Sequence, residues 1–283
     1  MDFLEVRRLV IIAMFSDDLL SDKLVLKGGN ALRIIHQVGT RTSLDVDFSI
    51  QDDFENLDEV RTRIFRALKE TFGAAGYVAF DERFETLPPD PLGGKNPRWG
   101  GYLVEFKLID IGKYEALLQD LESARRDALV IGGGQKRSFR VQISKHEFCD
   151  GKEEFEVDAH TIYVYSRAMI AAEKLRAICQ QMPEYSLTRH KAARARDFCD
   201  IYFLVTEGGV DLGSPANQEL IKQIFSAKDV PLELLGNVRG YREFHRPDWP
   251  SVVDSVSEGL MEFDFYFDFV LAEIDRLKTL WME

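Results

Sequence analysis

The chain has 283 residues, of which 45% are hydrophobic and 30% are charged, enough for a sizeable core in one large or two modest domains. With 36 Lys and Arg against 48 Asp and Glu, its net charge of -12 argues against a simple DNA-binding role without excluding a local basic patch. No apolar run approaches the roughly 18 residues of a membrane-spanning helix, and the three cysteines form no CxxC pair, so we expect no membrane partner and a location in the reducing cytoplasm.

The first part of the chain mixes helical spacing of apolar residues with the alternation that is typical of strands. Helices are predicted over 2–20, 30–37 and 57–75. Strands are predicted over 24–26, 43–50, 76–84, 101–109, 139–144 and 161–165. Between them, residues 87–101 are rich in Pro and Gly and predict a loop.

From Ser166 onward the pattern is helical, and Ser166 is the expected N-cap of the first helix. Helices are predicted over 166–181, 189–207, 215–226 and from 249 to the end. The sequence therefore predicts two domains, a mixed α/β domain over residues 1–165 and a helical domain over residues 166–283.

The sharpest local feature is a pair of glycines followed at a distance by a pair of acids. Gly28 and Gly29 lie between a predicted strand and a predicted helix, and fifteen residues separate them from Asp45 and Asp47. Residues i and i+2 of a strand point to the same side, which puts the two carboxylates on one face, about 7 Å apart along the chain. Two like charges so placed repel each other unless a cation lies between them, and their oxygens suit Mg²⁺ bound together with phosphates.

The glycines suit the other end of the same ligand. Without a Cβ the backbone can approach a phosphate, and the start of a helix offers N–H donors. Arg41 and Ser43, just before the acidic pair, could add phosphate contacts. Each half alone has a simpler interpretation, because Gly-Gly often forms only a turn and Asp-x-Asp is often a solvated face.

Together, Gly-Gly-x(15)-Asp-x-Asp resembles the signature of the polymerase-beta-like nucleotidyltransferase superfamily. Residues 25–32 and 43–48 are similar to the first motif of the AbiEii/AbiGii toxin family, whose members are nucleotidyltransferases of toxin–antitoxin and phage-abortive systems. Residues 164–177 and 194–202, which contain Lys174 and Asp197, are similar to that family's second block. The resemblance extends over residues 24–50 and 139–204, and no motif is matched in about the last 75 residues.

The resemblance implies a nucleotidyltransferase-fold domain with a mixed sheet, followed by the helical domain. It implies an enzyme that uses Mg²⁺ to transfer a nucleotidyl group from an NTP to an acceptor, either an RNA such as tRNA or a protein. It further implies a toxin or abortive-infection role with a cognate antitoxin, and it assigns activity to Lys174, touching the triphosphate, and to Asp197. From the helix alone, Lys174 lies on an apolar stripe and could instead snorkel or pair with an acid, and Asp197 and Asp200 could form an ion-paired helix start.

One position departs from the superfamily pattern. The strand that usually carries a third carboxylate resembles residues 139–144, where the position holds Gln142, and an amide cannot act as a base. Glu105 could substitute, the reaction could run with a reduced site, or activity could be lost. Two other functions therefore stay open: a nucleotide-binding regulatory module without transferase activity, and an interaction protein in which Asp45 and Asp47 are solvated.

Overall fold

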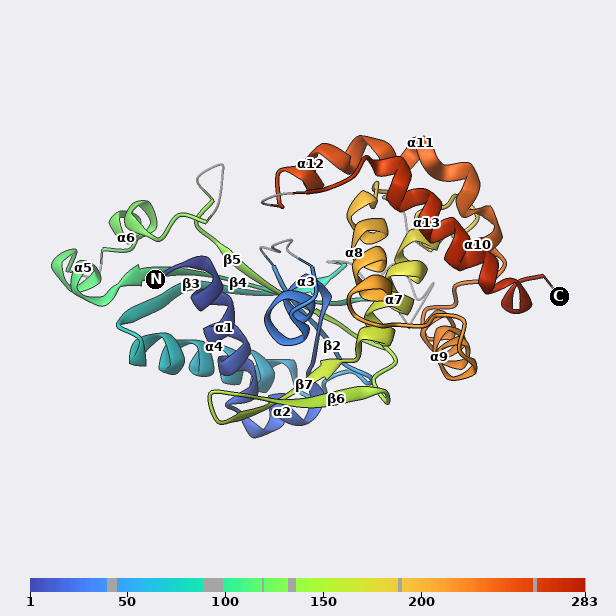
Figure 1. Ribbon diagram of the computed structural model, residues 1–283. Helices are drawn as coiled ribbons and strands as arrows, with labels where there is room; N and C mark the ends of the chain where they lie inside the picture. Colours follow the sequence, from blue (N-terminus) through green and yellow to red (C-terminus); the bar gives the residue numbers. More distant parts are fainter. Residues whose placement is uncertain are drawn as a thin grey trace. The chain divides into compact units, whose positions relative to one another are not determined.

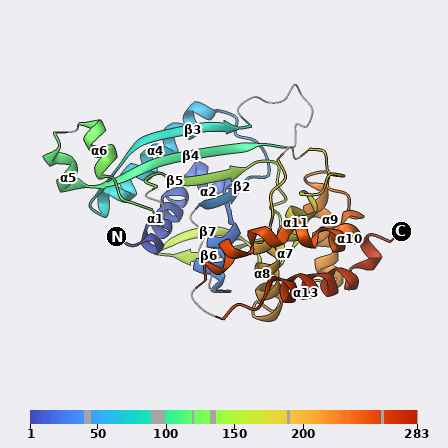
Figure 2. The same ribbon diagram turned by 90° about the horizontal axis from the view of Figure 1, so that it is seen from above.

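The computed structural model describes residues 1–39, 45–88, 99–118, 120–131, 136–187, 190–256 and 259–282 (Figures 1 and 2). The chain divides into two compact units. Unit 1 comprises Met1–Asn30, Ser43–Cys149 and Glu153–Val164, and unit 2 comprises Ala31–Thr42, Asp150–Lys152 and Tyr165–Glu283. The domain ranges 1–165 and 166–283 stay a prediction.

A seven-stranded sheet runs through the described part of the chain in the order β3-β4-β5-β2-β1-β7-β6. Its strands are β1 Val25–Lys27, β2 Val46–Ser49, β3 Tyr77–Leu87, β4 Gly101–Asp110, β5 Phe139–Ser144, β6 Lys152–Val157 and β7 His160–Tyr165. Strand β2 pairs antiparallel with β1 and parallel with β5, and β1 pairs parallel with β7. The sheet is mixed, which confirms the predicted fold class.

One face of the sheet packs against helices α1 (Phe3–Phe15) and α4 (Leu57–Ala74), which also contact each other (Figure 1). The aromatic ring of Phe48 in β2 lies 6.0 Å from that of Phe15, and the ring of Phe106 in β4 lies 5.7 Å from that of Phe72. Alternation along each strand sends the polar residues of β2, β4 and β5 to the other face. The sheet thus has one apolar, helix-covered face and one face that carries the acids.

Before Ser166, the structure divides a predicted helix and contains elements that the sequence pattern does not predict. The helix expected over 2–20 is two helices, α1 and α2 (Asp18–Lys23), because the Asp17 carboxylate caps the second by accepting a hydrogen bond from the Leu20 N–H at 3.3 Å. Strand β6 was not predicted, because the mostly charged sequence of this edge strand hides its strand periodicity. Two short helices, α5 (Ile111–Ala116) and α6 (Leu121–Asp127), were also not predicted.

Unit 2 is helical. After α3 (Gly28–Asn30), at which a segment of unit 1 ends, its chain begins with the π-helix η1 (Ala31–His36). Its longer helices are α7 (Arg167–Cys179), α8 (Ala195–Thr206), α9 (Pro215–Ser226) and α13 (Phe263–Arg276). Shorter helical segments are α10 (Leu234–Asn237), η2 (Val238–Tyr241), α11 (Arg242–His245), η3 (Arg246–Asp248), α12 (Trp249–Val253) and η4 (Lys278–Leu280). Helix α8 contacts both α7 and α13.

The core of unit 2 is aromatic. The ring of Phe198 in α8 stacks on Phe267 at 5.0 Å and meets Phe263 edge-on at 5.7 Å, and Trp249 is buried against Phe263. The alternating Phe residues from 263 onward form a helix, as predicted, although the predicted C-terminal helix is divided into α12 and α13. Helix α7 is capped by Ser166, whose Oγ accepts a hydrogen bond from the Met169 N–H, as predicted.

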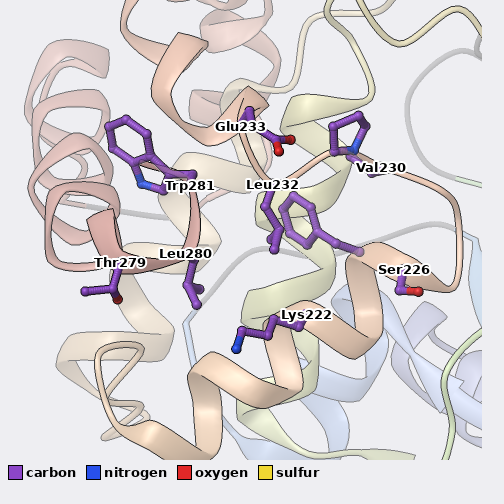
Figure 3. A pocket seen from close by; sticks show the side chains of 10 residues that line it. Lys222, Ser226, Val230, Leu232, Glu233, Thr279, Leu280 and Trp281 are labelled. Carbon is purple, nitrogen blue, oxygen red and sulfur yellow. The ribbon is translucent and has the colours of Figure 1, made fainter. Parts of the chain in front are cut away.

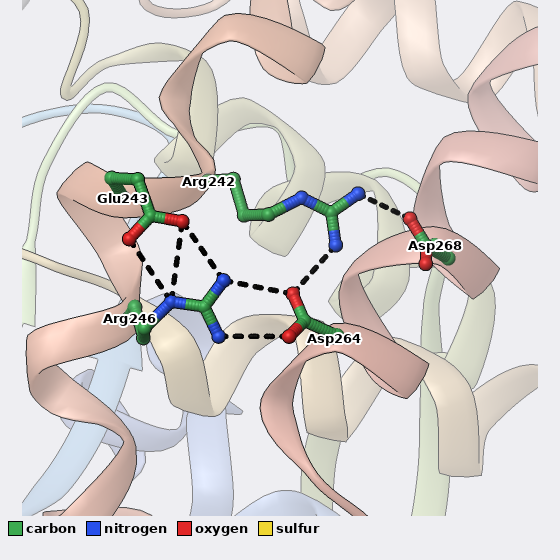
Figure 4. Close-up of polar contacts among 5 residues, drawn as sticks. All are labelled: Arg242, Glu243, Arg246, Asp264 and Asp268. Atoms are coloured by element: carbon green, nitrogen blue, oxygen red, sulfur yellow. Dashed lines mark hydrogen bonds and ion pairs between the residues drawn. The ribbon is translucent and has the colours of Figure 1, made fainter.

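Exposed ion pairs join α11 and η3 to α13 (Figure 4). Asp264 accepts hydrogen bonds from Arg242 Nη1 at 2.7 Å and from Arg246 Nη1 at 2.9 Å. Arg242 also pairs with Asp268, and Arg246 with Glu243. Among the helices that the structure describes, none combines the length and apolar character that crossing a bilayer requires.

Candidate active site

The turn after β1 and the acidic strand β2 are in direct contact. Gly28 follows β1 with φ +73°, a left-handed conformation that favours glycine. A Cβ placed on Gly28 would lie 2.7 Å from Oδ2 of Asp47, and Asp47 lies opposite Lys27 in the antiparallel register. The absence of a side chain at residue 28 therefore leaves room for the Asp47 carboxylate, which ties the two halves of the sequence motif together.

Asp45 accepts hydrogen bonds from two side-chain amides. The Asn30 side chain donates a hydrogen bond from Nδ2 to the main-chain carbonyl oxygen of Asp45 at 2.6 Å, and Gln142 Nε2 donates to Asp45 Oδ2 at 3.2 Å. Asp45 and Asp47 are both partly exposed. The structure thus brings Gly28, Asp45, Asp47 and Gln142 together, whereas Arg41 and Ser43 lie outside the described residues.

Gln142 and Glu105 differ in their distance from the acidic pair along the sheet. Gln142 lies opposite Asp47 in the parallel register of β2 and β5. Across β4, the residue opposite Gln142 is Leu103, while Glu105 lies opposite Arg140 and accepts a hydrogen bond from its Nε at 2.8 Å. The Glu105 carboxylate is therefore held by a cation at a neighbouring register position.

In unit 2, Lys174 forms an ion cluster with Asp197 and Asp200, which are buried, and with Arg194, which is partly exposed. Only 7% of Lys174 is exposed, and its Nζ donates to Asp197 Oδ1 at 3.1 Å and to Asp200 Oδ2 at 2.6 Å. The other Asp197 oxygen accepts from Arg194 Nε at 2.5 Å. Burial alone would raise the pKa of Asp197, but the positive charges of Arg194, Lys174 and Arg196 outweigh burial and hold that pKa below its ordinary value. The ion-paired state that the helix pattern left open for Lys174 is present.

His245 supports the same cluster through the main chain. The N-cap residue of α8, Arg194, makes no side-chain capping hydrogen bond. Instead, its main-chain N–H donates a hydrogen bond to His245 Nδ1 at 3.0 Å. Because Nδ1 accepts, the neutral ring carries its proton on Nε2, which is buried and has no partner among the described residues. Burial lowers the pKa of His245 to about 4. No pattern in the sequence indicates this contact, which joins residues 51 positions apart.

A cavity of about 540 Å³ lies within unit 2 (Figure 3). Lys222, Phe225, Leu232, Glu233 and Trp281 are among its lining residues, and none of the residues assigned to the site from sequence lines it. Within the described ranges, no group of three or more His, Cys, Asp or Glu side chains is placed to hold a metal ion. Asp45 and Asp47 could contribute at most two carboxylates, which is enough for a metal that is also bound by substrate phosphates.

The family described as Nucleotidyl transferase AbiEii toxin, Type IV TA system, matches residues 10–269 of the chain. The chain belongs to the AbiEii toxin family. This match confirms the resemblance stated from the motifs and extends it over most of the C-terminal residues that the motifs left unmatched. AbiEii proteins are nucleotidyltransferases, so the chain is a nucleotidyltransferase toxin, and the family implies a nucleotide substrate and an antitoxin.

The solved structures that are similar to this AbiEii chain share little sequence identity with it. A candidate nucleotidyltransferase of Helicobacter pylori is 15% identical, with a TM-score of 0.49 over 98% of this chain and 93% of that chain. JHP933 from Helicobacter pylori is 14% identical, with a TM-score of 0.49 over 97% of this chain and 90% of that chain. An antigenic nucleotidyltransferase-like protein from Paracoccidioides brasiliensis is 13% identical, with a TM-score of 0.37 over 90% and 95% of the two chains. No curated protein matches the chain in sequence.

Proposed function

We propose that the protein transfers a nucleotidyl group from an NTP to an acceptor in a Mg²⁺-dependent reaction at Asp45 and Asp47. The observation that carries the proposal is the contact between the two halves of the motif, in which the Asp47 carboxylate occupies the space that the missing Cβ of Gly28 leaves. This contact supports a role for Asp47 as a metal ligand better than it supports the alternative, in which Asp47 lies on a solvated strand face.

The donor set fits Mg²⁺. Two carboxylates on one strand supply hard oxygen ligands, and Mg²⁺ is commonly bound by one or two carboxylates together with the phosphates of a substrate. When bound, the ion would neutralise negative charge on the attacking and leaving oxygens of an in-line displacement. Asp45 and Asp47 would hold it, with Asp45 kept in place by its hydrogen bonds from Asn30 and Gln142.

We propose that the segment before the acidic pair binds the phosphates of the NTP. Main-chain N–H groups of Gly28 and Gly29 would contact the triphosphate, and Arg41 and Ser43 would add side-chain donors. From the family resemblance we also propose Lys174 and Asp197 as catalytic residues. Because the Lys174 ammonium already donates to Asp197 and Asp200, a contact with a triphosphate would have to compete with these two hydrogen bonds.

The acceptor is the least constrained part of the proposal. We infer an RNA acceptor, with tRNA as the first to test and a protein as the alternative, and a toxin or abortive-infection role that a cognate antitoxin counteracts. These substrates would place the reaction in the cytoplasm. Gln142 favours a second candidate, a module that binds NTP without transferring it, because its amide cannot take a proton from an attacking hydroxyl group.

The test is to incubate the protein with each α-³²P-labelled NTP and Mg²⁺, and with either total RNA or total protein, and to follow label in the acceptor. We expect label in RNA, lost in Asp47→Asn and retained in Asp268→Asn, a control that removes an exposed carboxylate on α13. If only protein is labelled, the acceptor is a protein and not an RNA. NTP binding with no transfer to either acceptor would favour the regulatory module, and unchanged transfer in Asp47→Asn would contradict the site.

A further inference from the structure

The turn between β1 and η1 touches both acids of the candidate site, and each contact is made by a different residue. Gly28 faces the Asp47 side chain, and Asn30 binds the Asp45 main chain. All four residues belong to unit 1. We propose that Gly28 and Asn30 are positioning residues that set the placement of Asp45 and Asp47 for a divalent cation; this inference rests on the proposed function.

Asn30 is the less expected member of this pair, because its burial leaves a polar side-chain atom without a hydrogen bond among the described residues. It is fully buried, and its side-chain oxygen Oδ1 has no hydrogen-bond partner among the described residues. A buried acceptor left unpaired is destabilising, whereas an apolar side chain of similar size has no such penalty. The polar contact that Asn30 makes is the 2.6 Å hydrogen bond from Nδ2 to the carbonyl oxygen of Asp45.

That hydrogen bond acts at the position where the acidic strand begins. Asp45 immediately precedes β2, so its main chain lies outside the hydrogen-bonded register that starts at Val46. The bond from Asn30 fixes the carbonyl of Asp45, and the bond from Gln142 orients its carboxylate. Without Asn30, Asp45 would keep the hydrogen bond from Gln142 but lose the one that its main-chain carbonyl accepts from Asn30.

Gly28 acts on the other carboxylate by exclusion. Any side chain at residue 28 would place a Cβ 2.7 Å from Asp47 Oδ2, closer than real Cβ contacts allow. The Asp47 carboxylate would then have to move, while a positive φ would add strain. The two effects are separable at Gly76, which has φ +82° and no described atom within 4 Å of the place a Cβ would take, so that Gly76→Ala adds strain alone.

The experiment measures Mn²⁺ binding to the full chain in the absence of NTP, from the electron paramagnetic resonance signal of free Mn²⁺, together with the melting temperature. Asn30→Leu should weaken Mn²⁺ binding about two- to tenfold, the range expected for loss of one hydrogen bond, with the melting temperature unchanged or higher. Asn30→Ala should weaken binding similarly. Gly28→Ala should weaken it at least as much as Asn30→Leu, while Gly76→Ala binds as the wild type does.

A matched control is available for the asparagine. Asn217 Nδ2 donates to the carbonyl oxygen of Asp211 at 2.7 Å in unit 2, so Asn217→Leu removes the same kind of bond away from the candidate site and should leave Mn²⁺ affinity unchanged. Wild-type Mn²⁺ affinity in both Asn30 variants, or in Gly28→Ala, would overturn the inference. So would a failure of both Asn30 variants to fold, which would make the residue structural.

Failure of the proposed function gives a different result. If the wild-type chain binds no Mn²⁺, or if Asp47→Asn binds it as the wild type does, the metal site itself is wrong and the inference falls with it. If Asp47→Asn loses binding while Asn30→Leu keeps it, the proposed metal site stands and only the role of Asn30 is wrong.

Discussion

The acids of unit 1 and those of unit 2 differ in burial and in the groups that donate hydrogen bonds to them. Asp45 and Asp47 are partly exposed, and Asp45 accepts hydrogen bonds from the neutral amides of Asn30 and Gln142. Asp197 and Asp200 are buried, and they accept hydrogen bonds from cations. A neutral donor orients a carboxylate without cancelling its charge. In a buried ion pair, by contrast, removal of one partner is strongly destabilising because the other charge stays buried. We therefore expect substitutions in the first group to change function with little effect on stability, and those in the second to lower stability in addition to any effect on activity.

The largest effect should follow loss of the cation in unit 2. Lys174→Met removes the ammonium and leaves two buried carboxylates, and breaking a buried pair in this way costs about 3–5 kcal/mol. Urea unfolding measures the loss. The matched control is Lys222→Met in α9, whose exposed pair with Glu219 should be worth little. Equal losses in the two variants would show that the cluster is not a stabilising feature.

The next effect is a pH dependence that His245 gives to unit 2. Its pKa is about 4 in the folded chain and 6.5 in the absence of burial, so the unfolded state binds the proton first as the pH falls. The free energy of unfolding should be highest above pH 6.5 and fall by on the order of 2 to 3 kcal/mol as the pH falls to about 4.

The variant that tests this titration is His245→Asn, which keeps an acceptor for the Arg194 N–H but does not titrate. Urea unfolding curves at pH 7, 5.5 and 4.5 should show a smaller fall for the variant than for the wild type. Parallel pH dependences would contradict the assignment. The Asp197 contribution is lost only at lower pH, because its pKa lies below 3.8, so the two groups titrate in separate windows.

In unit 1, removing an acid should have little effect on stability. Asp47→Ala relieves repulsion with Asp45 at a partly exposed position, so without metal the melting temperature should stay the same or rise. Asp197→Ala should lower it clearly, because Lys174 and Arg194 lose a buried partner. Differential scanning calorimetry of both variants compares the two groups directly. A large drop in Asp47→Ala would make the pair structural.

The smallest effect is expected for the exposed ion pairs between α11, η3 and α13 (Figure 4). Hydrogen bonds from Arg246 and then Arg242 lower the pKa of Asp264 to about 2, so any stabilisation is present above pH 3.8 and is lost as the pH falls toward 2. Asp264→Asn should change stability far less than Lys174→Met, and the difference from the wild type should disappear in 1 M salt. A loss that persists in high salt would contradict this.

The sequence by itself determined the elements whose side chains follow one repeating pattern. Alternation along residues 139–144 and helical spacing along 215–226 predicted β5 and α9 with the bounds that the structure has. The pattern also predicted Asp45 and Asp47 on one face of a strand, because residues i and i+2 point to the same side, but β2 begins at Val46 and Asp45 precedes it. The edge strand β6 is mostly charged and exposed, so its sequence lacks the alternation of apolar and polar residues that predicts a strand.

Only the tertiary structure decided which distant residues meet around the acids. The contacts of Asn30 with Asp45, Gln142 with Asp45 and His245 with Arg194 join residues 15, 97 and 51 positions apart. A periodic pattern records which side of an element is buried, but it does not record which residue of another element lies opposite. Sheet order and register bring Gln142 beside Asp47, and they leave Glu105 beside Arg140. For the same reason the sequence identified Lys174 as a cation on an apolar stripe, while the fold decided that two carboxylates bind it.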